Sequence, residues 1–348
     1  MSHVDSRWIK QRPHFLAQSL ARSEVSVTFV CSSLVRTAKL ISGQRLSVPV
    51  LRVPLMPQRL RRRFAILDPL LSWISAIAIV LVCRPDVAIM THSRHRRLAG
   101  ALRSMGVKIS YDCMDLNNLF DDALPTDQSD ERALVDSSSA VFCSSALIAE
   151  HIRGLSPERD IVIVPNALDP EAFHFPPSGG EVSVAKGTVG YIGAISKWFD
   201  FEAVLNLLAV NESVRVNLWG PCDVAIPEHP RLTYHGIADH PSAIGAMRGN
   251  EVLVLPFVVT DLIRAVDPVK LYEYIAAGRP VVASDYPQLD HFGDFISRYR
   301  NQDQFAEKVR HAMTTGHAPA PDVIREFVHA NSWRSRADTM LGKFEAIR

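Results

Sequence analysis

The stretch "DPVKLYEYIAAGRPVVASD", residues 267–285, contains a complete helix-to-strand unit. Asp267 is a candidate N-cap, and Pro268 suits the first turn of a helix, where its missing N–H costs nothing. The β-branched run after Gly278 is typical of a strand that is buried on both faces. We expect a helix that begins at Asp267 and ends before Gly278, followed by a strand over 280–285.

The same alternation of apolar strands and amphipathic helices continues outward along the chain. Further strands are expected over 26–31, 47–55, 86–92, 107–113, 140–145, 160–166, 188–195, 213–221, 231–237 and 251–257. Further helices are expected over 12–23, 96–106, 199–210, 240–248, 286–292, 302–314 and 323–347. Continuous apolar strands that alternate with helices indicate parallel sheets covered on both faces, so the predicted fold class is α/β.

The alternation pauses in a Pro- and Gly-rich segment, which divides the chain into two doubly wound, Rossmann-like domains. The expected parts are an N-terminal domain over 1–168, a linker over 169–187, a C-terminal domain over 188–330 and a helix over 331–348 that crosses back. Only the residues MSHV precede the first amphipathic segment. The first strand of the N-terminal domain is therefore expected to be very short or cut off by the start of the sequence.

Composition excludes several classes of protein. The 348 residues are 47% hydrophobic and 22% charged, which is typical of a globular protein and not of a disordered one. A formal net charge of +1 gives no general attraction for nucleic acid, so we expect no nucleic-acid partner. The five cysteines include no CxxC pair, and no cluster of His, Cys and carboxylates has the spacing of metal ligands. We expect no metal ion.

One apolar segment requires a membrane test. Residues 69–83 carry no charge, but they are fewer than the roughly 20 residues that a spanning helix needs. A buried helix of an α/β domain is the favoured interpretation. The alternative is contact with a membrane surface, because the basic stretch "QRLRRRF" (58–64) beside it would attract anionic lipid head groups. The arginines at 94, 96 and 97 are either a solvated face or contacts to an anionic acceptor.

Ligands of open parallel sheets bind beyond the carboxyl ends of the strands. Gly193 and Lys197 follow the strand over 188–195, and the next helix N-terminus would offer free N–H groups to a diphosphate. Lys270 and Glu273 are three residues apart and share a helix face. A salt-bridged surface helix explains that spacing equally well, but its place in the topology favours a ligand site.

Several stretches together resemble GT-B glycosyltransferases, in particular family-4-like enzymes of bacterial polysaccharide biosynthesis. They are "WIKQRPHFLAQSLA", "YDCMD", "VFCSS", "VPNALDPEAF", "GYIGAISKWFDFE", "PVKLYEYIAAGRPVVASD" and "NSWRSRADTML", and they cover nearly the whole chain. The resemblance implies two domains that face a cleft. The nucleotide would bind to the C-terminal domain and the acceptor to the N-terminal one.

The resemblance also implies roles for single residues of the donor site. Glu273 would bind the ribose hydroxyls, and Lys270 and Lys197 would neutralise the diphosphate. Gly193 would allow the diphosphate to approach closely, and Tyr272 is included in the same donor-binding set. Because lysine charges can replace Mg²⁺ at a departing diphosphate, we expect no cofactor.

The implied function is transfer of a hexose from a nucleotide-diphosphate sugar, favoured to be a UDP-sugar, to a glycan acceptor. The acceptor is expected to be linked to lipid pyrophosphate, in exopolysaccharide or cell-envelope polysaccharide synthesis. The expected location is the cytoplasm, with peripheral contact to anionic lipid at the inner face of the plasma membrane. Two alternatives are a nucleotide-sugar epimerase of the same fold and a non-catalytic nucleotide-sugar-binding subunit.

The sequence departs from the family pattern at one position. Many retaining family-4 enzymes have a second acidic residue in an E-x7-E arrangement, but Ala265 stands at that place before Glu273. Retention of configuration is therefore in doubt, and an inverting enzyme would need a general base on the acceptor side. Asp115 is the first candidate base, ahead of Asp112 and His92. A helix cap is an alternative role for Asp112, and His92 could instead bind a sugar hydroxyl or be structural.

Overall fold

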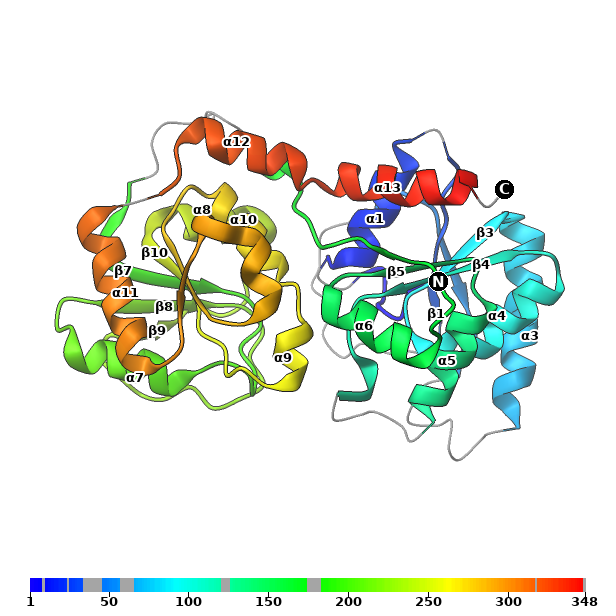
Figure 1. Ribbon diagram of the computed structural model, residues 1–348, viewed down its shortest axis with the longest axis horizontal. Helices are drawn as coiled ribbons and strands as arrows, with labels where there is room; N and C mark the ends of the chain where they lie inside the picture. The colour runs from blue at the N-terminus through cyan, green and yellow to red at the C-terminus, as the bar shows by residue number, and fades with distance from the viewer. Residues whose placement is uncertain are drawn as a thin grey trace. The chain divides into compact units, whose positions relative to one another are not determined.

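The computed structural model of the chain describes residues 1–7, 10–23, 25–33, 46–56, 66–119, 126–173, 183–316 and 318–346 (Figure 1). The chain forms two compact units. Residues Met1–Asn166 and Trp333–Arg348 make the first unit, and Ala167–Ser332 make the second. Each unit has its own parallel sheets and its own helices.

The first unit contains two parallel sheets. A two-stranded sheet pairs β1 (Phe29–Ser32) with β2 (Val50–Val53). A four-stranded sheet has the order β3 (Val87–Met90), β4 (Lys108–Cys113), β5 (Ala140–Cys143) and β6 (Ile161–Ile163). Figure 1 shows α1 (Arg12–Ala21) and α13 (Trp333–Ala346) together on one face of these sheets. The other face carries α3 (Leu67–Cys83), α4 (Arg96–Ser104), α5 (Asp127–Ser137) and α6 (Ala146–Leu155).

The second unit is built on a six-stranded, fully parallel sheet with the order β12-β11-β10-β7-β8-β9. Its strands are β7 (Ala185–Ile192), β8 (Arg215–Trp219), β9 (Leu232–Tyr234), β10 (Asn250–Leu255), β11 (Val281–Ser284) and β12 (Ser297–Tyr299). Because β7 lies between β8 and β10, the strand order reverses beside β7. That reversal is where ligands of open α/β sheets bind.

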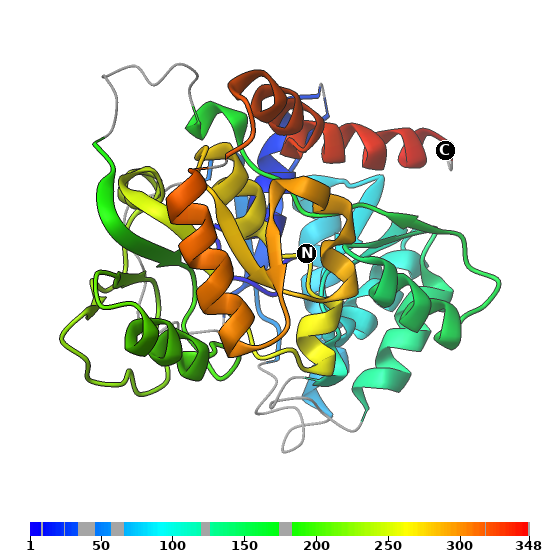
Figure 2. The ribbon, with the colours of Figure 1, turned by 60° about the vertical axis from the view of Figure 1, so that its left-hand side comes forward.

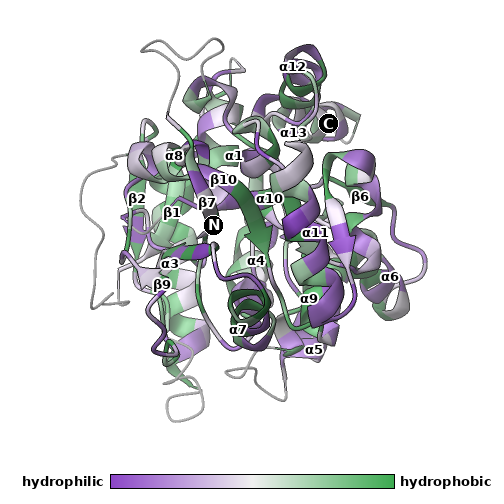
Figure 3. Cartoon of the chain, turned by 90° about the vertical axis from the view of Figure 1, so that its left-hand side faces the viewer, coloured by the Kyte–Doolittle hydropathy of each residue, from purple (hydrophilic) through white to green (hydrophobic). Residues whose placement is uncertain are grey.

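Helices cover both faces of the second sheet. One face carries α7 (Phe201–Val210) and α11 (Gln302–Thr315), which pack against each other, and Figure 2 shows α11 lying along the strands. The other face carries α8 (His240–Gly249) and α10 (Val269–Ala276), with α12 (Pro321–Ala330) packed on α10. In Figure 3 the hydrophobic strand colours lie between helices such as α11, whose surface is largely polar. This arrangement confirms the predicted α/β class with doubly wound parallel sheets.

Several elements differ from the expectations. Sequence periodicity did not predict α5, α6, the short α9 (Asp261–Ala265) or β12. The expected last helix is broken at Asn331 and Ser332 into α12 and α13. The helix expected over 286–292 is a 3-10 helix, η4 (Pro287–Phe295), which is interrupted at Gly293 by a left-handed φ of 49°. The predicted linker overlaps the first residues of β7, and part of it lies outside the described residues.

Candidate functional site

A buried carboxylate lies on α10 close to the point where the strand order reverses. Glu273 is only 4% exposed. Its Oε2 accepts a hydrogen bond from Lys270 Nζ at 2.6 Å, and its Oε1 lies 3.4 Å from Nε2 of His240 at the start of α8. The i,i+3 spacing that predicted a shared face therefore produces a direct ion pair.

Two opposing effects act on the pKa of Glu273. Burial favours the neutral acid, but the ammonium group of Lys270 and the imidazole of His240 outweigh it and lower the pKa to about 2. The carboxylate is therefore ionised at neutral pH although it is buried. A buried, ionised acceptor with partly exposed Lys270 beside it is suited to bind hydroxyl groups next to a phosphate.

Two tyrosines on either side of Glu273 fix the position of α10. The hydroxyl of Tyr274 accepts from the backbone N–H of Ile192 at 2.7 Å and donates to the carbonyl of the same residue at 3.2 Å. Tyr272 Oη donates to the carboxylate of Asp267 at 3.1 Å and lies 3.1 Å from His291 Nε2. The helix is thus attached to the last residue of β7 on one side and to its own preceding loop on the other.

These contacts correct two predictions. Tyr272 is wrong as a donor-binding side chain, because it is 0% exposed and its ring packs in the core against Phe292. Asp267 is wrong as the N-cap, since Pro268 occupies that position with no side-chain cap bond and Asp267 is buried against Tyr272. Gly278 does follow the end of the helix, with a left-handed φ of 72°.

The loop after β7 carries Lys197, whose side chain is exposed. The loop is joined to the loop after β10, because Val258 N–H donates to the carbonyl of Trp198 and Asp200 N–H donates to the carbonyl of Pro256, both at 2.8 Å. The N-terminus of α7 is capped at one N–H group, and its role in binding a diphosphate stays a prediction. The carboxylate of Asp200 accepts from Ala203 N–H at 2.9 Å and so caps α7.

Packing against neighbouring residues of the same unit requires glycine at position 193. A Cβ at this position would lie 2.8 Å from the hydroxyl of Tyr191. A Cβ on Gly220, whose φ is +136°, would lie only 1.9 Å from the carbonyl oxygen of Gly193. The ends of β7 and β8 therefore touch through two glycines. The role of Gly193 in phosphate binding stays a prediction.

The ends of β8 and β9 carry an aromatic pair, with Trp219 as the last residue of β8 and His235 directly after β9. Trp219 and His235 stack with ring centroids 4.3 Å apart and an interplanar angle of 10°. The Tyr234 hydroxyl donates to the carbonyl of Gly220 at 2.8 Å, and Gly220 N–H donates to the carbonyl of Gly236. The loops after both strands lie at the carboxyl edge of the sheet.

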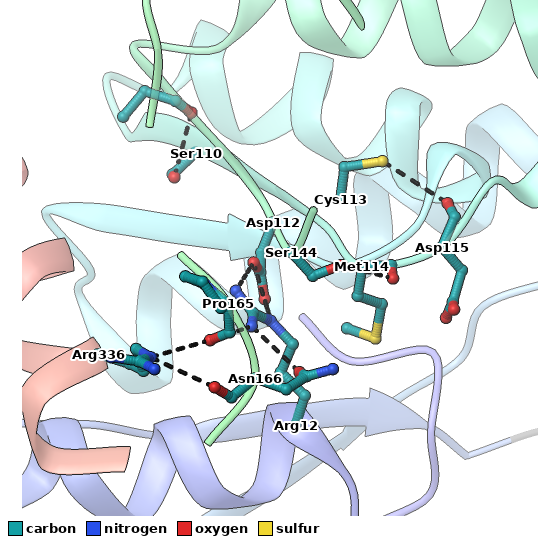
Figure 4. Close-up of polar contacts among 11 residues, drawn as sticks. Arg12, Ser110, Asp112, Cys113, Met114, Asp115, Ser144, Pro165, Asn166 and Arg336 are labelled. Carbon is teal, nitrogen blue, oxygen red and sulfur yellow. Dashed lines mark hydrogen bonds and ion pairs between the residues drawn. The ribbon is translucent and has the colours of Figure 1, made fainter. Parts of the chain in front are cut away.

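In the first unit, Asp112 is wrong as a candidate base (Figure 4). It is 1% exposed and holds Arg12, whose Nη2 donates to Oδ1 at 2.8 Å and whose Nε donates to Oδ2 at 3.0 Å. Arg12 Nη1 also donates to Pro165 O and Asn166 Oδ1, both at 3.2 Å. A carboxylate in this buried ion pair is a structural group that cannot reach a substrate hydroxyl.

Asp115 lies two residues beyond the carboxyl end of β4 and is half-buried. Burial raises the pKa of its carboxyl to about 7, with the positive charge of Arg12 opposing the shift and the negative charge of Asp112 adding to it. Figure 4 shows the Asp115 side chain pointing away from the Arg12–Asp112 pair. A carboxyl that titrates near neutral pH is suited to general base catalysis, so Asp115 remains the candidate.

His92 follows β3 and caps a short 3-10 turn. Its Nδ1 accepts from Arg94 N–H at 3.1 Å, so the neutral ring carries its proton on Nε2. Its ring contacts His3 edge-on at a centroid distance of 5.4 Å. Burial, followed by the charge of Arg94, lowers the pKa of His3 to about 3. Since its Nδ1 is held by the backbone of Arg94, His92 has a structural role in this turn, and a role as base or sugar ligand stays a prediction.

Helix α3 is oriented with its larger apolar side chains outward, so the expectation of a buried helix is wrong. Its buried residues are Asp68, Ser72, Ser75, Ala76 and Ile79. Its exposed apolar stripe is Leu70, Trp73, Ile74, Ile77 and Leu81, of which Leu81 is 72% exposed. The basic stretch 58–64 lies outside the described residues. Within the described ranges, no helix is both long and apolar enough to cross a bilayer.

Sequence reasoning missed the contacts that join distant parts of the chain. His240 meets Glu273 from 33 residues away, and its only sequence signal is its place directly after Asp239, which caps α8. Arg12 meets Asp112 across 100 residues. In the part of the chain that the structure describes, no three His, Cys, Asp or Glu side chains gather as metal ligands would.

Comparison with known proteins gives one relative in sequence. No protein-family model matches the chain. TuaH of Bacillus subtilis, provisionally described as a teichuronic acid biosynthesis glycosyltransferase, is 27% identical over 203 residues, which are 52% of this chain and 51% of TuaH. The chain thus matches about half the length of this curated relative.

Solved structures match over nearly the whole chain. Sucrose-phosphate synthase from Thermosynechococcus elongatus has a TM-score of 0.74 at 14% identity, covering 95% of this chain and 91% of its own. An Escherichia coli trehalose-6-phosphate protein bound with UDP-2-fluoro glucose has a TM-score of 0.73 at 13% identity, covering 98% and 97%. HepE of Anabaena, in complex with UDP, has a TM-score of 0.69 at 13% identity, covering 96% of both chains. The chain has the GT-B fold, as its motifs predicted.

Proposed function

We propose that the protein is a glycosyltransferase that moves a sugar from a nucleotide-diphosphate donor, a UDP-sugar, to a glycan acceptor. The observation that carries the proposal is the buried, ionised Glu273 with Lys270 2.6 Å away, on a helix attached to the end of β7. The similarity to TuaH supports the reaction class. The UDP and UDP-sugar in the matched structures of HepE and the Escherichia coli protein support the donor.

The donor would bind to the second unit. Glu273 would accept hydrogen bonds from two ribose hydroxyls, and Lys270 would then turn from the carboxylate to the diphosphate. Lys197 would add a second positive charge from the exposed loop after β7. We propose that these two lysines offset the charge of the leaving diphosphate without a metal ion, so that transfer would be unchanged by EDTA.

The acceptor would bind to the first unit, with Asp115 as general base of an inverting displacement. Asp115 would take the proton of the acceptor hydroxyl while its oxygen forms a bond to the anomeric carbon. The bond from that carbon to the diphosphate oxygen would break, and its electron pair would leave with the nucleotide diphosphate. The anomeric configuration of the product, measured by NMR, tests this step, because a retained configuration would exclude it.

The experiment that tests the donor site is a UDP titration of Glu273→Ala, with Glu307→Ala on the exposed face of α11 as matched control. Loss of hydrogen bonds to a charged acceptor should weaken UDP binding by about 10- to 100-fold. The control should bind as the wild type does. If Glu273→Ala stays folded and binds UDP equally well, the site assignment fails.

Ala265 supports a second candidate, a non-catalytic subunit that binds a nucleotide sugar. It occupies the place of the additional acid, is 2% exposed, and so offers no catalytic group there. Incubation with donor sugars and glycan acceptors separates the candidates. A non-catalytic subunit would bind the UDP-sugar but would not cleave it, so no free UDP would form. A transferase would release UDP and extend the acceptor.

We also propose that the acceptor is lipid-linked and that α3 places the first unit against an anionic membrane surface in the cytoplasm. The exposed stripe around Trp73, Ile77 and Leu81 is an apolar face of the kind that lies in a bilayer interface. Flotation with phosphatidylglycerol vesicles should be lost in Ile77→Asp/Leu81→Asp and kept in Val210→Asp, an exposed apolar position on α7. If the wild type and both variants float equally, the proposal is wrong.

A further inference from the structure

His240 is the second basic neighbour of the buried carboxylate, and the proposed function gives it no role. Its side chain is 28% exposed, and its Nε2 lies 3.4 Å from Oε1 of Glu273. That separation is longer than the roughly 2.7–2.9 Å of a charge-assisted hydrogen bond. Lys270 Nζ, by contrast, lies 2.6 Å from Oε2. Lys270 is therefore the closer partner of Glu273, and His240 has room to approach.

The start of α8 holds His240 at the carboxyl edge of the sheet. Asp239 caps this helix by accepting a hydrogen bond from Ser242 N–H at 2.9 Å. The last turn of α8 lies at the amino end of the strands, because β10 begins directly after it and Asn250 Nδ2 donates to Ala246 O at 2.7 Å. The first turn therefore lies at the other end, where ligands of parallel sheets bind.

Charged groups from two helices surround the His240 imidazole. They are the Lys270 ammonium and Glu273 carboxylate of α10 and the Asp239 carboxylate next to it in the chain. The strands on which α8 packs carry their charged side chains at the opposite end, where Lys186 of β7 pairs with Glu251 of β10 at 2.7 Å. Lys270 and the N-terminus of α8 oppose a positive charge on His240, whereas the two carboxylates favour one.

We propose that His240 is a positioning residue that becomes the cationic partner of Glu273 when the donor binds, and that it takes up a proton from the solvent in that step. This inference rests on the proposed function, in which Lys270 turns from Glu273 to the diphosphate. The turn removes a positive charge from beside the buried carboxylate, and the diphosphate brings negative charge to the same edge of the sheet. Imidazole is the side chain that gains a proton most readily near neutral pH.

A protonated His240 would keep Glu273 ready to bind the ribose. Its Nε2 would hold one lone pair of Oε1, and the other lone pairs of the carboxylate would accept the two ribose hydroxyls. By linkage, proton uptake makes UDP bind more tightly as the pH falls, by about threefold per pH unit if half a proton is taken up. Glu273 itself, with a pKa of about 2, adds no pH dependence in the range where imidazole titrates.

The first test counts the protons. UDP is titrated calorimetrically, with EDTA present, in buffers of different ionisation enthalpy at about pH 7.5. Because the terminal phosphate of UDP also titrates, near pH 6, the wild type is compared with His240→Gln. The Gln amide keeps a hydrogen-bond donor at the same reach but takes no proton. We expect the wild type to take up about half a proton more per UDP. Equal uptake would overturn the proposal, since the proton would then go to another group such as Glu273.

The second test separates positioning from a structural role by measuring the Kd of UDP against pH. His240→Gln should bind as the wild type does at about pH 8.5 and about 5- to 10-fold more weakly than the wild type at about pH 6. His240→Ala, which also loses the donor, should bind at least about threefold more weakly at both pH values. His311→Gln, at an exposed position of α11, is the matched control and should follow the wild type. If both His240 variants follow the wild type at both pH values, the proposal is wrong.

The outcomes for His240 and for the donor site can be told apart. A Tm within about 3 °C of the wild type shows that a His240 variant keeps its fold, and if His240→Ala loses it, His240→Gln decides alone. If the wild type does not bind UDP, or Glu273→Ala binds it equally well, the donor site fails and the role of His240 fails with it. If Glu273→Ala weakens binding while His240→Gln keeps the wild-type pH dependence, only the role of His240 is wrong.

Discussion

Replacing Arg12 by Met should destabilise the first unit strongly. The guanidinium is 3% exposed, and its partner, the Asp112 carboxylate, is 1% exposed. Removing one partner of such a pair leaves the other charge buried and uncompensated, which costs about 3–5 kcal/mol. Arg12 also binds Pro165 O and Asn166 Oδ1, but Arg336 Nε donates to Pro165 O as well, at 3.2 Å. The unpaired Asp112 should therefore dominate the loss.

The expected loss can be measured as a shift of the unfolding midpoint. In a unit of this size, each kcal/mol corresponds to a Tm change of about 2–4 °C, so Arg12→Met should lower the Tm by about 6–20 °C. The matched control is Arg334→Met, because Arg334 pairs with Asp338 on the surface, where the two side chains are 54% and 55% exposed. That substitution should cost at most about 1 kcal/mol.

A double-mutant cycle separates the ion pair from other effects of the substitution. Asp112→Leu alone should also destabilise, because it leaves Arg12 buried without its carboxylate. The double variant Arg12→Met/Asp112→Leu removes both charges and should recover most of the lost stability, with a coupling energy of about 3 kcal/mol. Urea unfolding of the wild type, the two single variants and the double variant gives the free energy of unfolding at each corner of the cycle. A double variant as unstable as the sum of the two single variants would refute the reasoning, as would a cost below about 1 kcal/mol for Arg12→Met.

Three more predictions follow from the geometry. The lowered pKa of Glu273 contributes up to about 3 kcal/mol to the free energy of unfolding above pH 4.5, the ordinary pKa of its carboxyl, and this contribution is lost as the pH falls towards 2. Urea unfolding should therefore show a free energy of unfolding that depends less on acid pH in Glu273→Gln than in the wild type. Equal pH dependence of the two proteins would contradict the assignment. If Asp115 is the base, kcat/KM should rise with pH through an apparent pKa near 7, and Asp115→Asn should lose that limb together with about 100-fold or more of the rate. Gly220→Ala should cost more than about 2 kcal/mol in thermal unfolding, since its Cβ would lie 1.9 Å from Gly193 O; a Tm unchanged from wild type would show that the two strand ends can separate.

The sequence predicted the elements whose pattern is local. Strands that are buried on both faces are mostly apolar runs, so β5 (AVFC) and β11 (VVAS) could be predicted from their composition. The Lys270–Glu273 pair could be predicted as well, because residues three apart on a helix are neighbours. Helix α5, "DQSDERALVDS", could not, since its polar surface residues leave only a few apolar positions to mark it.

Contacts between distant residues could not be predicted in the same way. The uncharged run over 69–83 favoured a buried helix, but it did not show that the face with Ser72 and Ser75 is the buried one. Those hydroxyls bond to Asp68 O and Pro54 O, so they are satisfied in the interior. Likewise, Tyr272 is next to Glu273 in sequence yet points into the core. The direction of a side chain depends on packing partners that a single sequence does not reveal.

The hydroxyl of Tyr274 has a consequence for how donor specificity could change. Its two hydrogen bonds to the backbone of Ile192 fix the helix that carries Glu273 against the strand that leads to Lys197. If Glu273 and Lys197 hold the donor as proposed, a change of sugar or base would not be accommodated by sliding α10, because that would break both bonds. Variation would then have to come from the loops after β8 and β9, around the Trp219–His235 stack. Exchange of these loops would be the way to give this scaffold a different donor while the Lys270–Glu273 pair is kept.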